Sequence, residues 1–173
     1  MRQEHLDQLR SLVLPSNGHE GAALLLCSTA AVDRDPWSGL ATTRFLSRDV
    51  IAIAPEDIAA SSGVHITVRT NSLARALRRA RDERLIVGFV HSHPQGPAIF
   101  SEQDDSHEPL MAELARNRNG CATPLLSLLT TQDGRLAGRV WREVAPPLPF
   151  DMIRVVGDRL SLHYDEGVAL VVR

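Results

Sequence analysis

Residue types that bind metal ions cluster in the segment 88–105 (GFVHSHPQGPAIFSEQDD). His91 and His93 end an apolar run, and side chains at positions i and i+2 lie on the same face of a strand. A catalytic zinc usually takes three protein ligands and leaves its fourth position to water. Asp104 is the candidate third ligand, because a loop rich in proline and glycine lets the chain turn back and a helix beginning near Ser101 would direct it inward. This pattern predicts a Zn²⁺ site.

Hydrolysis at such a site also needs a group that moves a proton. Zinc lowers the pKa of a bound water to about 7, so the attacking oxygen is available near neutral pH. A carboxylate from another element usually transfers the proton. Glu20 stands at the start of the apolar segment 21–29 (GAALLLCST), and we take it as the candidate general acid/base.

Each of these residues also has an ordinary structural interpretation. An isolated His-x-His pair is often two polar residues at the end of a strand. The sequence from Ser101 to Asp104 has the form of a helix N-terminal capping box. Glu20 alone reads as a surface carboxylate, and the nearby His19, Asp105 and His107 read as solvent-exposed residues that could also support the site. The spacing of two histidines and an acid after a buried strand favours the metal site.

The rest of the chain predicts helices and strands without strict alternation. Helices are expected over residues 2–13, from a cap at Asn71 or Ser72 to about Arg84, and from Ser101 to about 118 with a break at Pro109. Strands are expected over 21–29, 64–69 and 85–91. A loop at 31–39 follows the first of these strands, and two apolar runs around 40–46 and 48–54 come after it. A hairpin of 124–131 and 135–142 is expected about Asp133-Gly134. This order indicates an α+β fold with a mixed β-sheet flanked by helices.

Length and composition limit the classes of protein. The 173 residues fit one domain over 1–145, and a proline-rich boundary separates it from a C-terminal extension over 146–173. No secretory leader and no apolar run of the ~20 residues needed to cross a bilayer is visible, and the two cysteines form no CxxC pair, which favours a cytoplasmic protein without a membrane partner. The net charge of -2 argues against a nucleic-acid partner. All 19 basic residues are arginine, a bias typical of GC-rich bacterial genomes.

The segment His-Ser-His-Pro, followed after seven residues from His93 by Ser-x-x-Asp and preceded by an upstream glutamate, resembles the JAMM motif of the JAB/MPN metalloproteases. The resemblance extends from residue 2 to about 142 and implies the JAB/MPN (cytidine-deaminase-like) fold. It also implies that His91, His93 and Asp104 are the zinc ligands and that Glu20 is the general acid/base. Ser101 would donate a hydrogen bond to the tetrahedral oxyanion.

The same resemblance implies a function and its partners. Members of the family cleave amide bonds at the C-terminus of ubiquitin-like proteins, so we expect a bacterial deubiquitinase-like isopeptidase or peptidase. Its neighbours would be the activating and conjugating enzymes of the same operon, for which antiviral defence is one expected role, and the substrate tail would lie along the strand edge near residues 40–54. Three alternatives remain open: trimming of a sulfur-carrier tail, the DNA-repair-associated branch, which usually has Asn at the position of Ser92, and a non-catalytic MPN scaffold.

Overall fold

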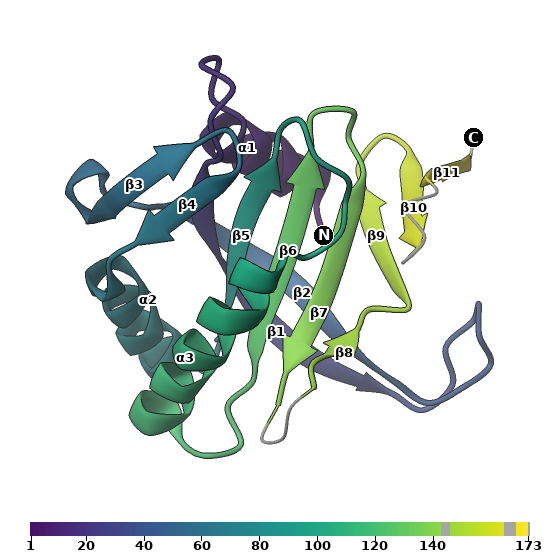
Figure 1. Cartoon of the computed structure of the whole chain (residues 1–173). Coiled ribbons are helices and arrows are strands. Elements are labelled where there is room, and N and C mark those ends of the chain that lie inside the picture. Colours follow the sequence, from purple (N-terminus) through teal and green to yellow (C-terminus); the bar gives the residue numbers. More distant parts are fainter. Residues whose placement is uncertain (143–145, 165–168, 173) are drawn as a thin grey trace.

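A mixed six-stranded sheet forms the centre of the structure, a computed structural model that describes residues 1–142, 146–164 and 169–172 (Figure 1). Its strands, in spatial order, are β2 (Thr42–Ala52), β1 (Ala22–Val32), β5 (Ile86–His93), β6 (Leu125–Thr131), β7 (Leu136–Trp141) and β8 (Leu148–Pro149). Of these strand pairs, β5 and β6 run parallel and the others run antiparallel. Helix α1 (Gln3–Val13) covers one face, and α2 (Thr70–Glu83) and α3 (Glu102–Asn119) cover the other. The predicted α+β class, with a mixed sheet flanked by helices, is confirmed.

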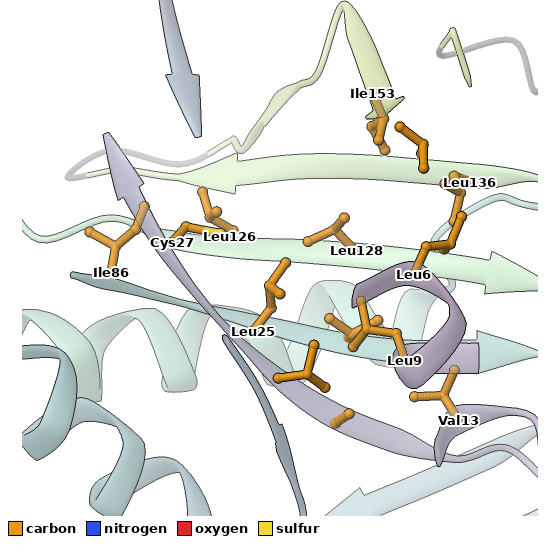
Figure 2. Close-up of a cluster of buried hydrophobic side chains, with 14 of the residues drawn as sticks. Leu6, Leu9, Val13, Leu25, Cys27, Ile86, Leu126, Leu128, Leu136 and Ile153 are labelled. Atoms are coloured by element: carbon orange, nitrogen blue, oxygen red, sulfur yellow. The ribbon is translucent and has the colours of Figure 1, made fainter. Parts of the chain in front are cut away.

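Two apolar layers explain why the central strands read as continuous apolar runs. On β1, Leu25 and Cys27 face α1, whereas Leu24 and Leu26 face α2 and α3. Figure 2 shows the first layer, in which Leu6, Leu9 and Val13 of α1 pack over side chains of the sheet; its other labelled members are Leu25, Cys27, Ile86, Leu126, Leu128, Leu136 and Ile153. A strand covered on both faces has no solvent side on which to place polar residues.

The two apolar runs predicted around 40–46 and 48–54 belong to one strand, β2. Leu26 of β1 pairs with Asp49, and the next residue of β1, Cys27, pairs with Ser47, so Arg48 is an extra residue in β2. A β-bulge of this kind interrupts the in/out alternation of side chains. The strand therefore reads as two segments. Its neighbour β1 also continues to Val32, into the region predicted as a loop.

A small hairpin of β3 (Ile58–Ser62) and β4 (His65–Val68) follows β2 after the short helix η1 (Pro55–Asp57). The sequence predicted β4 but not β3, because most of the side chains of β3 are exposed. Figure 1 shows this hairpin beside the end of β5. It therefore lies next to the strand that carries the two histidines.

The predicted cap of α2 at Asn71 or Ser72 is wrong. The helix begins at Thr70 without a side-chain cap. Asn71 Nδ2 and Ser72 Oγ instead donate to the carboxylate of Asp57, at 3.2 and 2.5 Å. Asp57 is 1% exposed and also pairs with Arg75, so this buried carboxylate holds the two side chains that were expected at the N-cap. Such a long-range contact leaves no local signal.

The predicted break of α3 at Pro109 is also wrong, since the helix runs without interruption from Glu102 to Asn119. Ala112 and Ala115 pack in the core beyond the proline, and Glu108 before it is buried in hydrogen bonds to the sheet. Tertiary contacts on both sides thus hold the helix together across a residue that lacks a backbone N–H.

Replacing this proline should stabilise the fold. Pro109→Ala supplies an N–H that can bond the carbonyl of Asp105. An interior proline costs a helix ~3 kcal/mol. Alanine offsets less than about 1 kcal/mol of this gain, because it gives the unfolded chain more conformational entropy than proline does. We expect the free energy of unfolding to rise by about 2 kcal/mol, measured by urea denaturation. An unchanged or lower value would show that the surroundings of α3 have adapted to the proline ring.

The C-terminal strands pack on the same body as the rest of the chain. β8 pairs with β7, while β9 (Met152–Val156), β10 (Leu160–Tyr164) and β11 (Ala169–Val172) form a separate three-stranded sheet. Ile153 and Val155 of β9 enter the apolar layer under α1, and Val156 bridges Arg2 at the start of the chain. Among the described residues, no helix is both long and apolar enough to cross a membrane.

Candidate metal centre

The pairing of β1 with β5 brings Glu20 to the histidines. The two strands are antiparallel and Ala22 is the partner of His91, so Glu20, two residues earlier, lies opposite His93. The rings of Phe89 and His91 stack with centroids 5.6 Å apart, which places His91 on the face of the sheet that α2 and α3 cover. Residues far apart in the sequence therefore meet at one end of the sheet.

The first turn of α3 brings Asp104 to the same place. Asp104 Oδ1 lies 3.1 Å from His91 Nε2, and Oδ2 lies 3.7 Å from His93 Nε2. One ligand atom from each of His91, His93 and Asp104 lies within 4.8 Å of the other two. The structure thus assembles the three residues that the sequence suggested as ligands into a group that can hold a metal ion.

The side chain of His91 supports a metal at this position. It is 1% exposed, and among the described residues neither ring nitrogen makes a hydrogen bond of good geometry, although Nε2 lies 3.1 Å from Asp104 Oδ1. A buried polar group without a partner is costly, and coordination of an ion removes that cost for a ring nitrogen. Two imidazoles and one carboxylate are also the donor types that catalytic zinc sites use. The residues present therefore fit a metal ion.

Asp104 belongs to the capping box of α3 as well as to the metal group. Its Oδ2 accepts hydrogen bonds from the backbone N–H and the hydroxyl of Ser101, at 2.7 and 2.8 Å, and its own N–H donates to Ser101 Oγ. Burial would raise the pKa of Asp104, but His91 and the bonds from Ser101 outweigh it and hold that pKa well below its usual range. The capping interpretation and the ligand interpretation are compatible, because Oδ2 accepts the capping bonds while Oδ1 faces His91.

Glu20 lies beside the ligands without belonging to their group. Its Oε1 is 3.8 Å from His93 Nε2, and the residue is 6% exposed. Burial raises the pKa of Glu20, and the charge of Asp104 adds to this increase while His91 opposes it. The β3–β4 hairpin holds its backbone, since Glu20 N–H donates to Ser62 O at 2.6 Å and Ser61 Oγ donates to Glu20 O at 2.7 Å. A carboxylate placed in this way suits proton transfer.

Ser92 and Gly21 hold the other side of Glu20, and the sequence did not indicate this role. Ser92 lies on the α1 side of β5, is fully buried, and donates its hydroxyl to Val13 O while accepting from Gly21 N–H at 3.1 Å. A Cβ on Gly21 would stand 2.7 Å from Val13 Cα and O. The residue after Glu20 therefore has to be glycine for α1, β1 and β5 to meet.

Gly21→Ala should disturb this junction. A methyl group forced against the backbone of Val13 is an overpacking change, which costs about 1–3 kcal/mol of the free energy of unfolding. Gly63→Ala is the matched control, because its Cβ would have Gly18 O at 3.6 Å as its nearest neighbour. Chemical denaturation of both variants checks the expectation, and equal stabilities would mean that the junction relaxes without cost.

The other polar residues near the ligands in sequence lie outside the metal group. His19 and His107 are exposed, and Asp105 forms an ion pair with Arg139 at 2.6 Å. Arg139 of β7 and its partner Glu108 of α3 are buried, and sequence reasoning missed both. Two charged residues that are 31 positions apart give no local signal that they meet.

The fold and the His-His-Asp group define an α+β domain with three residues that could hold a metal ion. A family model described as prokaryotic homologs of the JAB domain matches residues 2–143. The chain therefore belongs to the prokaryotic JAB-domain family, which includes the JAMM metallopeptidases, and the predicted family assignment is confirmed. A comparison with curated proteins found no match.

Proposed function

We propose that this protein is a zinc-dependent isopeptidase or peptidase that cleaves after the C-terminal residue of a ubiquitin-like protein. One observation carries the proposal: His91, His93 and Asp104 converge on one point, and the buried carboxylate of Glu20 stands 3.8 Å from His93 Nε2. A pure binding scaffold has no use for a carboxylate buried next to a metal group at the cost of its own desolvation.

The donor set of two imidazole nitrogens and one carboxylate oxygen favours zinc. When bound by these three residues, zinc would polarise the scissile carbonyl as a Lewis acid and make a water acidic enough to attack at neutral pH. His91 is held by burial and by Phe89, while Asp104 is held by its bonds to Ser101. The site thus offers ligands whose positions are set by the fold.

Glu20 takes the role of general acid/base in this proposal. It accepts the proton of the attacking water and then delivers it to the nitrogen of the leaving amine. A raised pKa suits both steps, because a group with a pKa nearer the working pH both accepts and returns a proton. Its backbone bonds to Ser61 and Ser62 keep the carboxylate beside the metal group during the two transfers.

Ser101 takes the role of the oxyanion donor. Its hydroxyl is exposed and bonds Asp104 in the structure, so it has to turn toward the substrate to donate to the oxygen that becomes negative. Ser101 is also the N-cap of α3, and the positive end of a helix dipole favours negative charge at the same place.

The proposed substrate is an extended tail that lies along the edge of β2, the outermost strand of the six-stranded sheet on that side. The ubiquitin-like protein and its activating and conjugating enzymes would be encoded in the same bacterial operon, with antiviral defence as one proposed role, and the reaction would take place in the cytoplasm. Trimming of a sulfur-carrier tail uses the same chemistry and is the alternative that the test below distinguishes.

The test uses the ubiquitin-like protein encoded beside this chain, prepared both as a linear C-terminal fusion and as a lysine conjugate. Cleavage of both after the last residue is expected from the zinc-loaded protein, analysed by intact mass spectrometry. Cleavage of the linear fusion alone would favour carrier trimming. A zinc-loaded protein that cuts neither but binds the ubiquitin-like protein would overturn the proposal in favour of a scaffold.

A further inference from the structure

A buried ion pair connects α3 to the sheet close to the metal group. Glu108 lies one helical turn after Asp104 and is 1% exposed. Its carboxylate accepts hydrogen bonds from Arg139 Nε at 2.8 Å and Trp141 Nε1 at 2.6 Å, both on β7, and from the hydroxyl of Ser127 on β6. The helix that carries Asp104 is therefore anchored to two strands through one carboxylate.

Arg139 contacts the start of α3 at two further points. Its Nη1 donates to Asp105 Oδ1 at 2.6 Å, and its guanidinium carbon lies 3.9 Å from the ring centroid of Phe100. Phe100 precedes the N-cap residue Ser101, and its ring lies 6.1 Å from the ring of His91. One side chain from β7 thus touches the residues on either side of the capping box that presents Asp104.

The first turn of α3 depends on contacts of this kind. Pro109 has no N–H, so the carbonyl of Asp105 lacks its usual partner within the helix. On the side away from Arg139, Gln103 Oε1 accepts a hydrogen bond from His65 Nδ1 of β4 at 2.7 Å. The turn that carries Asp104 is held between β4 on one side and the charged side chain of Arg139 on the other.

We propose that Arg139 is a positioning residue for the metal centre. By holding Phe100, Asp105 and Glu108, it keeps Asp104 at the distance from His91 at which the three ligands can share one ion. The inference concerns metal affinity and coordination geometry, so it stands whether or not the bound ion hydrolyses anything.

This arrangement of contacts requires the chemistry of arginine. A guanidinium is planar and carries donors in a fixed fork, so it bonds two carboxylates in different directions while its face lies on an aromatic ring. A lysine ammonium keeps the charge beside Glu108 but has no flat face and no fork. Residues that orient metal ligands typically affect metal affinity by about 10–100-fold.

Stability alone gives a weaker reason for such a group. The desolvation cost of a buried ion pair often exceeds the attraction between its charges, and apolar replacements of similar volume are often neutral. If Arg139 had only a structural role, its replacement would change the melting temperature without changing the affinity or the coordination geometry of the bound ion. This difference separates the two roles in an experiment.

The chain contains a matched control. Arg154 donates to the buried carboxylate of Asp35 at 2.8 and 2.9 Å, and its guanidinium carbon lies 4.1 Å from the ring centroid of Trp37. This second arginine has the same two kinds of contact, but Asp35 and Trp37 lie in the loop between β1 and β2, at the opposite end of the sheet from the histidines (Figure 1). Among the described residues, Arg154 makes no contact with the metal group.

The experiment compares Arg139→Lys with Arg154→Lys in the full chain. Zinc affinity is measured by competition with a chromophoric chelator, and the visible spectrum of the Co²⁺ form reports coordination geometry. Arg139→Lys is expected to bind zinc at least about 10-fold more weakly and to change the Co²⁺ spectrum. Arg154→Lys is expected to leave both unchanged while lowering the melting temperature by a similar amount.

A second variant protects the test against a folding defect. Asp105→Asn removes the negative charge from one of the contacts of Arg139, at a side chain that is 60% exposed, and it should change the Co²⁺ spectrum in the same direction to a smaller extent. Wild-type affinity and spectrum in both variants would overturn the inference, as would an equal loss of affinity in Arg154→Lys. A wild-type protein that binds neither ion would overturn it together with the ligand assignment. Normal zinc binding without cleavage of any substrate would contradict the proposed function alone.

Discussion

Glu20→Gln is expected to reduce the rate of peptide-bond cleavage by about 10²–10⁴-fold, the usual contribution of a general acid/base. The amide has the shape of the carboxylate but cannot accept and return a proton. The zinc content should stay at one ion per chain, since Glu20 lies outside the group of three ligands. The melting temperature should not fall, because the variant no longer buries a carboxylate. Single-turnover kinetics checks the cleavage rate, and metal analysis checks the zinc content.

A nearby acid provides the control for this result. Glu102 occupies the first turn of α3 and is exposed, so Glu102→Gln removes the same charge close to the site without touching the ligands. Its rate should stay close to that of the wild type. A Glu20→Gln variant that retains full activity with a normal zinc content would remove Glu20 from the mechanism and leave only a structural role for it.

His91→Ala is expected to remove bound zinc altogether. This imidazole is the most deeply buried of the three ligands, and the ion would lose one of the three protein atoms that hold it. The protein should remain folded, because the variant also removes two buried ring nitrogens that make no hydrogen bond of good geometry within the described part of the chain. Metal analysis after dialysis against a weak chelator, with circular dichroism of the same sample, measures both effects.

His5→Ala is the matched control for the loss of zinc. His5 is also a buried histidine, but it contacts Ser47 at 2.8 Å on the α1 side of the sheet. Its replacement should cost stability and leave the zinc content unchanged. Zinc lost equally from both variants would point to a general effect of unfolding, and zinc retained by His91→Ala would refute the ligand assignment.

The fold class and the metal group could be predicted because their signals are local. Residues 85–91 form an apolar run that ends in His91, which indicates a covered strand, and His93 follows at strand spacing. The segment from Ser101 to Asp104 carries a capping pattern that places the acid at the start of a helix. Each of these features depends on neighbours within a few residues.

Features that depend on distant contacts could not be predicted. Asp57 accepts hydrogen bonds from Asn71 and Ser72, which were expected to cap α2, and Arg139 meets Glu108 from another element. The continuity of α3 through Pro109 likewise depends on packing rather than on propensity. The roles of Glu20 and Ser101 remain predictions, although the structure places both beside the ligands.

The two halves of the site reach their place by different routes. The three ligands come from one local unit, β5 with the loop and helix that follow it, whereas Glu20 arrives through the register of β1 against β5. A slip of one residue in that register would turn every side chain of β1 to the opposite face. In the proposed mechanism, metal binding and hydrolysis therefore depend on different parts of the chain. One substitution at position 20 would then remove the general acid/base and leave the three ligands in place.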